Sequence, residues 1–418
     1  MTFYLFSLGC KVNNYECQAI SSRLIEEGFI YDKDNPDIVI INTCSVTHVA
    51  DQKSRQHIRK FKKNNPNALI VVMGCYSQGN PEFVLEECGA DIVIGTSNRD
   101  KLVDYIHEAL KNKKKIIDVD NKPREFKYEE LGITSYSENI RAYLKIQDGC
   151  DNFCTYCIIP YRRGRSRSRD FNEIIKEANE LVNKGYKEIV LTGVHIGRYG
   201  LDNGSSFSTL VEELCKIDKL YRLRISSIEE SEIDDKLISL ISSNPKIAHH
   251  LHIPLQSGSN NVLKRMARRY TKEEFLAKIN KIKSLLPNIC LTTDLIVGFP
   301  GESEEDFLET LSFLKEVGFH QIHVFPYSIR NGTPAATYKD QIDPKIKHDR
   351  ELKVLAYSIS SFDNYSRSYE GKEVTVIIEK YDEEKHLYYG HSSNYLDVYI
   401  EGDNLKVGDI VTTKYIFR

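Results

Sequence analysis

The sequence predicts an α/β protein in three parts: an N-terminal doubly wound parallel α/β domain, a central partial (β/α)6 barrel and a small C-terminal β-barrel. Three observations support this fold class. Over the first third of the chain, continuous β-branched runs alternate with amphipathic stretches, which is typical of a parallel sheet covered on both faces. A second series has six such units, whereas a complete barrel needs eight. Beyond residue 369, short β runs are punctuated by glycine.

Changes in composition set the expected domain boundaries. The chain divides into an N-terminal domain at 1–115, a polar linker at 116–140, a barrel at 141–343, a connecting helix at 344–368 and a β module at 369–418. Hydrophobic residues make up 41% and charged residues 28% of the 418 residues, which is typical of globular domains with sizeable cores. The formal net charge is only −3, so any affinity for nucleic acid must come from local patches.

The sequence shows neither a signal peptide nor an apolar stretch long enough to span a bilayer. We therefore expect a cytoplasmic protein without a membrane partner. Ten cysteines without an export signal favour metal ligation in a reducing compartment over a disulfide framework.

In the N-terminal domain, three cysteines occupy equivalent positions. We expect strands at 3–6, 37–41, 68–73 and 91–94, and helices near 14–27, 46–63, 81–87 and 100–111. Cys10, Cys44 and Cys75 directly follow the first three strands. Open α/β sheets bind ligands at the carboxyl ends of their strands. These thiols should therefore converge and hold an iron–sulfur cluster, although cysteines are also common as buried residues near strand ends.

In the barrel, we expect strands at 141–147, 188–192, 222–226, 249–253, 291–297 and 321–325, with helices near 171–184, 209–217, 234–243, 272–285 and 304–317. The loop after the first strand carries Cys150, Cys154 and Cys157. Thiolates select iron–sulfur clusters, zinc or cuprous copper. Because no fourth Cys or His lies nearby, the loop favours a [4Fe-4S] cluster with one open iron over structural zinc, which normally has four protein ligands. The alternatives are a zinc knuckle or three core cysteines.

Two arginine-rich runs predict a nucleic-acid surface. The first run comes just after the cysteine loop and has five arginines in eight residues: Arg162, Arg163, Arg165, Arg167 and Arg169. The second contains Arg268 and Arg269. Guanidinium groups bind phosphates bidentately, and such a concentration on a nearly neutral chain favours RNA or DNA as a partner. The alternative is a solvated charged face.

These motifs resemble the methylthiotransferase branch of the radical S-adenosylmethionine (SAM) superfamily along the whole chain. They are Gly9-Cys10-Lys-Val-Asn13, Asn42-Thr-Cys44, Gly74-Cys75, Gly149-Cys150 to Cys157, Ile159-Pro160, Leu255-Gln256-Ser-Gly258 and Asp294-Leu-Ile-Val-Gly-Phe-Pro-Gly301. The resemblance implies an N-terminal methylthiotransferase domain, a radical SAM barrel and a TRAM domain, which is a small RNA-binding β-barrel. The segments at 9–13 and 163–169 are most similar to the subfamily that modifies N6-threonylcarbamoyladenosine at position 37 of tRNA.

The resemblance also implies the cofactors and partners. Two [4Fe-4S] clusters would be bound and used catalytically, one by Cys150, Cys154 and Cys157, the other by Cys10, Cys44 and Cys75. The first would cleave SAM to a 5′-deoxyadenosyl radical, and the second would carry the sulfur that becomes a methylthio group on C2 of the adenine. The implied partners are a tRNA anticodon stem-loop, an electron donor such as a flavodoxin or ferredoxin, and a sulfur source.

Four residues at the carboxyl ends of barrel strands or in the cysteine loop are candidates for binding SAM: Tyr156, Gly193, Glu229 and Gln256. Tyr156 would lie near the adenine, and Gly193 permits close backbone approach. Glu229 can accept hydrogen bonds from ribose hydroxyls, its alternative being a solvated loop carboxylate. Four histidines could be metal ligands but are interpreted as hydrogen-bonded strand-end or packing residues, because thiolates already account for the metals: His195, His249, His250 and His252.

Two kinds of alternative remain open. The same chemistry can act on another substrate, either an isopentenyladenosine-containing tRNA or a ribosomal protein. A different class is a non-catalytic Fe–S protein that binds RNA and senses redox state.

Overall fold

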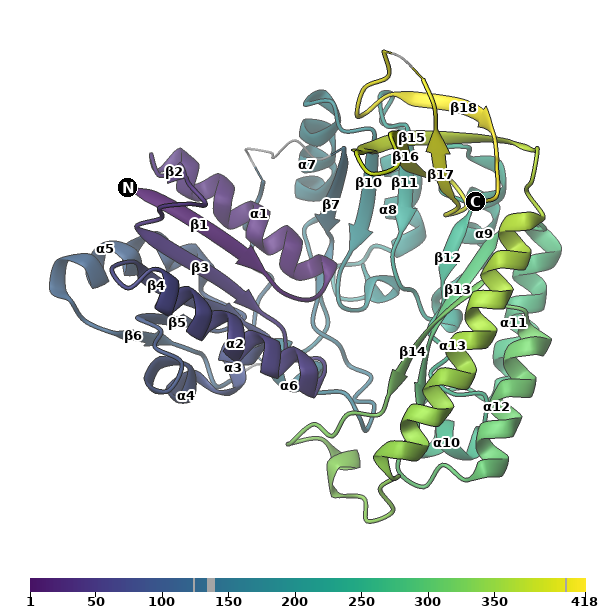
Figure 1. Cartoon of the computed structure of the whole chain (residues 1–418), viewed down its shortest axis with the longest axis horizontal. Helices are drawn as coiled ribbons and strands as arrows, with labels where there is room; N and C mark the ends of the chain where they lie inside the picture. Colours follow the sequence, from purple (N-terminus) through teal and green to yellow (C-terminus); the bar gives the residue numbers. More distant parts are fainter. Residues whose placement is uncertain (123–124, 134–139, 403) are drawn as a thin grey trace.

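The N-terminal domain, the barrel and the β module follow one another along the chain in the predicted order (Figure 1). The structure is a computed structural model and describes residues 1–122, 125–133, 140–402 and 404–418. In this part of the chain, no helix is both long enough and apolar enough to cross a membrane.

The N-terminal sheet has six parallel strands in the order β2-β1-β3-β4-β5-β6. Its strands are β1 (Thr2–Ser7), β2 (Ile30–Tyr31), β3 (Ile38–Thr43), β4 (Leu69–Gly74), β5 (Ile92–Ile94) and β6 (Ile116–Asp118). Its helices are α1 (Lys11–Glu26), α2 (His48–Asn64), α3 (Cys75–Gly79), α4 (Pro81–Glu86) and α5 (Leu102–Asn112). Separate hydrophobic clusters cover the two faces of the sheet, which explains the continuous apolar runs of its central strands.

The predicted linker at 116–140 is not a simple connection. It begins with β6, which pairs in parallel with β5 and extends the first sheet. Residues 123–124 and 134–139 lie outside the described residues. Glu129 pairs with the buried Arg99 at 2.6 Å, and the Tyr128 hydroxyl donates to the Lys145 carbonyl at 3.0 Å. This polar stretch therefore supplies partners for buried charges between the domains, which its composition alone did not indicate.

The barrel has six parallel strands, as predicted. They are β7 (Arg141–Lys145), β10 (Glu188–Thr192), β11 (Arg222–Ile225), β12 (His250–His252), β13 (Cys290–Val297) and β14 (Gln321–Pro326). Ladder pairs give the orders β11-β10-β7 and β12-β13-β14, and two parallel bridges, Leu223 to Ile247 and Ser227 to His252, join the two halves. The covering helices are α7 (Phe171–Asn183), α8 (Phe207–Cys215), α9 (Asp235–Ser243), α11 (Lys272–Leu285) and α12 (Glu304–Val317).

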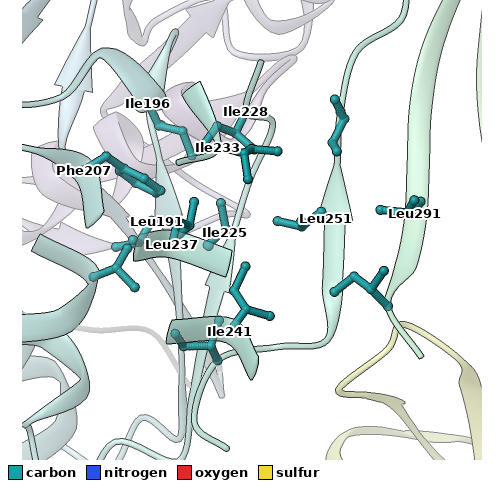
Figure 2. Close-up of a cluster of buried hydrophobic side chains, with 14 of the residues drawn as sticks. Leu191, Ile196, Phe207, Ile225, Ile228, Ile233, Leu237, Ile241, Leu251 and Leu291 are labelled. Atoms are coloured by element: carbon teal, nitrogen blue, oxygen red, sulfur yellow. The ribbon is translucent and has the colours of Figure 1, made fainter. Parts of the chain in front are cut away.

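One continuous core joins the barrel strands to their helices. Figure 2 shows Leu191, Ile225, Leu251 and Leu291 on successive strands, near side chains such as Leu237 and Ile241 of α9. The short elements β8 (Gln147–Asp148), α6 (Ile159–Arg163), β9 (Arg167–Ser168) and α10 (Asn260–Arg265) lie in the connections and were not predicted. They shape the loops at the carboxyl ends of the strands.

The C-terminal module follows the predicted connecting helix, α13 (Pro344–Arg367). Its strands, β15 (Glu373–Asp382), β16 (Leu387–Ser392), β17 (Asp397–Ile400) and β18 (Ile410–Lys414), form an antiparallel sheet in the order β17-β16-β15-β18. Among the residues described, the outer strands β17 and β18 do not pair, so a closed barrel stays a prediction.

The module contacts the amino ends of the barrel strands, away from the cysteine loops. Arg222 donates to the carbonyls of His391 and Thr375 at 3.1 and 3.2 Å. Arg141, the first residue of β7, pairs with Glu379 at 2.7 Å. These contacts are partly or fully buried and join two modules that are distant in sequence.

His391 makes this contact dependent on pH. Burial opposes its charge, but bonds to Asp397 and Glu379 outweigh that effect and raise its pKa, with Arg141 acting in the opposite direction. A raised pKa stabilises the folded state fully below about pH 6.5, and the stabilisation is lost as pH rises through the folded value. We expect His391→Gln to cost about 1–2 kcal/mol at pH 6 and much less at alkaline pH, measured by thermal unfolding. The exposed His348→Gln is the control. An equal loss at both pH values would contradict the assignment.

Candidate active site between the two α/β domains

The first triad, Cys10, Cys44 and Cys75, collects at the carboxyl ends of β1, β3 and β4. Cys10 directly precedes α1, and Cys75 is the first residue of α3. Gly9 has a φ of +101°, and a Cβ there would lie 2.7 Å from the Cys44 sulfur, so glycine lets the Cys10 loop close onto Cys44. Burial, then the nearby thiols of Cys75 and Cys10, raise the pKa of Cys44 to about 12. The three thiols are therefore near neighbours.

The second triad, Cys150, Cys154 and Cys157, lies in the loop after β8. The Cys150 N–H donates to the Gly164 carbonyl, and the Cys157 N–H donates to the Cys154 carbonyl, both at 3.0 Å. Burial, together with the thiols of Cys154 and Cys150, raises the pKa of Cys157 to about 12. Such mutual repulsion between thiolates is relieved when a metal centre binds them.

Each triad offers three thiolates, which are donors that iron–sulfur clusters accept. Among the described residues, no three His, Cys, Asp or Glu side chains are close enough to hold one ion. A four-iron cluster places each thiolate on a different iron, so its ligands lie farther apart than those of zinc.

His195 is hydrogen-bonded at the carboxyl end of β10, as expected for a strand-end histidine, and it also contacts the second triad. Its Nδ1 lies 3.4 Å from the Cys150 sulfur, and its Nε2 lies 2.7 Å from Glu232 Oε1. The side chain is buried at the carboxyl end of β10. Its position directly after a barrel strand was the signal that favoured a functional role.

A cavity of about 370 Å³ opens beside the second triad. It is lined by residues including Asn152, Cys154, His195, Glu229, Glu230 and Arg268. Glu229 and Arg268 form an ion pair in its wall, and burial, followed by repulsion from Glu229, raises the pKa of Glu230 to about 7. The cavity therefore combines carboxylates with a guanidinium directly against a cluster-type cysteine.

The predicted SAM-binding residues are not all at this cavity. Glu229 lines it, and is paired with Arg268 instead of being solvated. Tyr156 packs edge-on against Phe299, with ring centroids 6.4 Å apart. A Cβ at Gly193 would lie 2.9 Å from the Gln147 carbonyl oxygen, so close backbone approach is present there. Gln256 adopts a φ of +66° and bridges to β13.

The arginine run does not form the predicted phosphate-binding surface. Arg163, Arg167 and Arg169 are buried. They pair with carboxylates of Glu16, Asp148, Glu130 and Glu177 at 2.6–3.2 Å. The prediction is wrong for these three and for Arg268, whose side chain is only 4% exposed in its pair with Glu229. Their partners lie far away in sequence, which made a structural ion-pair network resemble a surface run.

Three of the predicted phosphate contacts stay accessible. Arg165 and Arg269 are exposed and lie against the Cys150–Cys154 loop. Arg165 pairs with Asp151 Oδ1 at 3.2 Å, and Arg269 donates to the Asp151 carbonyl at 3.4 Å. Arg162 is half-buried, and a Cβ at Gly79 would lie 2.1 Å from its guanidinium carbon.

An open parallel barrel whose first loop carries three cysteines is the arrangement of radical SAM enzymes. The description of the Radical SAM superfamily matches residues 144–314, and that of Uncharacterized protein family UPF0004 matches residues 2–95. The fold resembles the solved radical S-adenosylmethionine methyltransferase TsrM from Kitasatospora setae. The TM-score is 0.62 at 14% identity, covering 80% of this chain and 77% of that one.

Curated relatives extend over nearly the whole chain. Threonylcarbamoyladenosine tRNA methylthiotransferase MtaB of Bacillus subtilis is 45% identical over 99% of this chain and 94% of its own length. The tRNA-2-methylthio-N(6)-dimethylallyladenosine synthase of Clostridium perfringens is 38% identical, covering 99% and 95%. The chain belongs to the radical SAM methylthiotransferase family. It is an enzyme, and its family implies a [4Fe-4S] cluster and SAM as cofactors.

Proposed function

We propose that this enzyme adds a methylthio group to C2 of N6-threonylcarbamoyladenosine at position 37 of tRNA, using two [4Fe-4S] clusters and SAM. The observation that carries the proposal is that adjacent residues link the two thiol triads of separate domains: Arg163 donates to the Cys75 sulfur, and Gly164 accepts from the Cys150 N–H. The identity of 45% to the threonylcarbamoyladenosine enzyme, against 38% to a dimethylallyladenosine enzyme, supports the substrate. A tRNA substrate also supports our expectation of a cytoplasmic location.

The second triad is the proposed site of radical formation. Cys150, Cys154 and Cys157 would hold one cluster, with SAM in the adjacent cavity. When bound, these groups supply a 5′-deoxyadenosyl radical, so the protein's task is to bind, orient and exclude water. His195 orients the Cys150 thiolate through its bond to Glu232. Glu229 and Arg268 give the cavity wall an acceptor and a donor for the polar groups of SAM.

The first triad is the proposed site of the second cluster and of the sulfur to be transferred. Cys10, Cys44 and Cys75 would supply three thiolates and leave one iron free. An external electron donor, such as a flavodoxin or ferredoxin, and a sulfur source are the remaining partners that this reaction requires.

The RNA must present an unstacked base to the space between the triads. Exposed Arg165 and Arg269 flank the Cys150 loop and suit backbone phosphates. The C-terminal sheet, which we interpret as a TRAM domain, carries a second surface. There Lys385 Nζ lies 3.9 Å from the ring centroid of Tyr399, and Tyr399 pairs with Tyr389 at 5.1 Å. Aromatic rings beside lysines are typical of surfaces that stack single-stranded bases.

We expect the double variant Arg165→Ala/Arg269→Ala to weaken tRNA binding about 5- to 30-fold, which corresponds to 1–2 kcal/mol. The salt dependence of log K should become shallower by about one unit per lost phosphate contact. Fluorescence anisotropy with an anticodon stem-loop at several salt concentrations measures both. Lys216→Ala/Lys236→Ala, on exposed parts of α8 and α9, is the control. An unchanged slope would exclude these arginines from the RNA interface.

Mass spectrometry of tRNA nucleosides tests the substrate. Cells lacking the protein should lose the 2-methylthio derivative of threonylcarbamoyladenosine and regain it on complementation. If these cells instead lose the 2-methylthio derivative of dimethylallyladenosine, that tRNA nucleoside is the substrate. If they lose the methylthio group of a ribosomal protein, that protein is the substrate. Formation of 5′-deoxyadenosine from SAM under reduction would exclude the redox-sensor alternative.

A further inference from the structure

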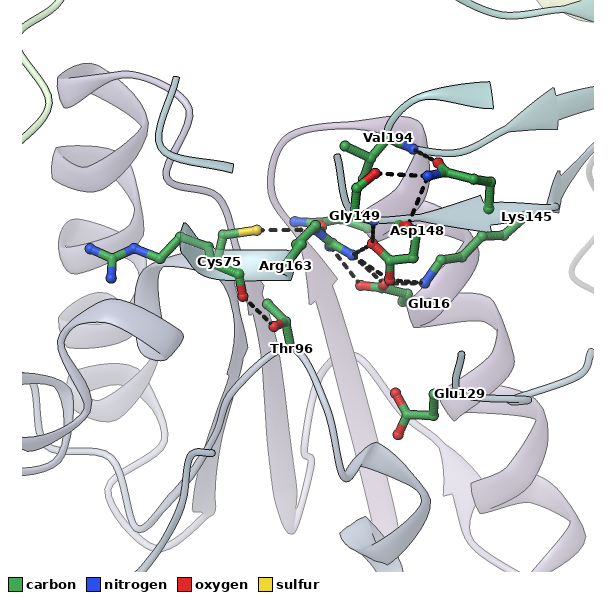
Figure 3. A network of polar contacts seen from close by, with 12 residues as sticks. Glu16, Cys75, Thr96, Glu129, Lys145, Asp148, Gly149, Arg163 and Val194 are labelled. Carbon is green, nitrogen blue, oxygen red and sulfur yellow. Dashed lines mark hydrogen bonds and ion pairs between the residues drawn. The ribbon is translucent and has the colours of Figure 1, made fainter. Parts of the chain in front are cut away.

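Arg163 and Gly164 connect the two triads through adjacent groups of the chain. The Arg163 Nε–H donates to the Cys75 sulfur at 3.3 Å, and the Gly164 carbonyl accepts from the Cys150 N–H at 3.0 Å. α6, which carries Arg163, begins two residues after Cys157. Figure 3 shows the Arg163 side chain between Cys75 and the segment that contains Asp148 and Gly149.

The same guanidinium supports the other two cysteines of the first triad through Asn13. Arg163 Nη2 donates to Asn13 Oδ1 at 3.0 Å, and this oxygen also accepts from the Cys10 thiol at 3.8 Å. The Asn13 amide donates to the carbonyl of Thr43, the neighbour of Cys44, at 3.1 Å. All three strand ends that deliver these cysteines therefore depend on one side chain of the barrel.

The network around Arg163 has an excess of positive charge. Glu16 of α1 accepts from Arg163 at 2.8 and 3.2 Å, and Asp148 of β8 accepts at 3.2 Å. In this set of ion pairs, four cations, Arg99, Lys145, Arg163 and Arg167, meet three carboxylates, Glu16, Glu129 and Asp148. The difference is 4 − 3, or one positive charge. A buried charge needs a partner, and Cys75 would supply one as the thiolate ligand of a bound cluster, because burial raises the pKa of its free thiol.

We propose that Arg163 is a positioning residue that fixes the separation of the two triads and, through its N–H···S bond to Cys75, sets the reduction potential of a cluster bound at the first triad. The presence of that cluster rests on the proposed function. Hydrogen bonds to cluster sulfurs favour the electron-rich state, so they raise the potential. Because Arg163 bridges the triads, its loss should let SAM cleavage continue while less of the methylthio group is transferred.

The reduction potential of a cluster at the first triad is measured in a chain from which the cysteines of the second triad have been removed. The full chain carrying Cys150→Ala, Cys154→Ala and Cys157→Ala is titrated electrochemically and followed by electron paramagnetic resonance, with and without Arg163→Lys. We expect Arg163→Lys to shift the midpoint to a more negative potential. Arg350→Lys is the matched control, because Arg350 is equally buried and paired with Glu302 at 2.7 Å but lies outside the network. The Arg350→Lys variant should have the same midpoint potential as the chain that carries only the three Cys→Ala substitutions.

The coupling is measured in the chain with both triads intact. Lysine keeps the charge but cannot make the fork of bonds to Cys75 and Asn13. We expect Arg163→Lys to raise the ratio of 5′-deoxyadenosine to methylthiolated product about 10- to 100-fold, the usual range for groups that orient metal ligands. In the metal-free protein, hydrogen exchange of the Cys150 amide should also become faster. Arg350→Lys should change neither quantity.

Asn13→Ala provides a second route if Arg163→Lys does not fold. It removes the acceptor that anchors Arg163 Nη2 at 3.0 Å without leaving a buried carboxylate unpaired. The guanidinium then holds its N–H less firmly against Cys75, so the potential should shift in the same direction. An unchanged potential and product ratio in a folded variant overturn the inference. A wild-type chain that binds about four irons instead of about eight refutes the proposed second cluster itself.

Discussion

Cys154→Ala is expected to reduce 5′-deoxyadenosine formation from SAM to the level of a sample without enzyme. Cys154 is buried in the loop after β8, adjoins the cavity proposed for SAM and lies 3.6 Å from Arg268 Nη1. Removing one of three thiolates leaves too few ligands to retain the cluster on which SAM cleavage depends. The reaction is measured anaerobically with dithionite by liquid chromatography. Methylthiolated tRNA should disappear with it.

The control for this variant is Cys215→Ala. Cys215 is equally buried but ends α8 inside the barrel core, remote from both triads. Its loss creates only a small cavity, so product formation should persist. Wild-type rates of 5′-deoxyadenosine formation in Cys154→Ala would exclude the second triad as the site of radical formation.

Cys44→Ala is expected to have the opposite selectivity, abolishing methylthiolation while SAM cleavage continues. Cys44 belongs to the N-terminal domain, whereas the cavity and the second triad belong to the barrel. Bound iron should fall from about eight to about four atoms per chain. SAM cleavage should continue, because Cys44 lies in neither the second triad nor the lining of the cavity beside it.

Iron and sulfide quantitation, with product analysis by mass spectrometry, measures this effect. Cys88→Ala is the matched control, since Cys88 is a buried cysteine of the same domain that packs in a hydrophobic cluster. If Cys44→Ala keeps both its iron and its methylthiolation, the first triad is not a cluster site.

The positions of the cysteines could be predicted because each depends on local sequence. An apolar strand followed by Cys places that thiol at the carboxyl edge of a parallel sheet, whatever happens elsewhere in the chain. The six barrel strands were predicted for the same reason. Whether each arginine is buried in an ion pair or exposed could not be predicted, because it depends on contacts between distant parts of the chain. Glu16 lies 147 positions from Arg163, and neither residue shows this pairing in its surroundings.

Other differences have a similar origin. β6 is a short edge strand in a charged stretch, and only its pairing with β5 reveals it. His195 resembled a packing histidine because the loop that brings Cys150 to it is 45 positions away. Local patterns determined the elements, while long-range packing decided which polar side chains are structural and which are available to ligands.

The docking of the C-terminal sheet at the amino ends of the barrel strands separates the two surfaces to which we assign RNA binding. From Arg141, which contacts that sheet, to Asp148 beside the cysteine loop, the chain is extended over seven residue steps, or roughly 23 Å at ~3.3 Å each. An isolated nucleoside is too short to reach both ends. Under the proposed function, only an RNA that extends over this distance, such as a stem-loop, can contact both the C-terminal sheet and the cysteine loop.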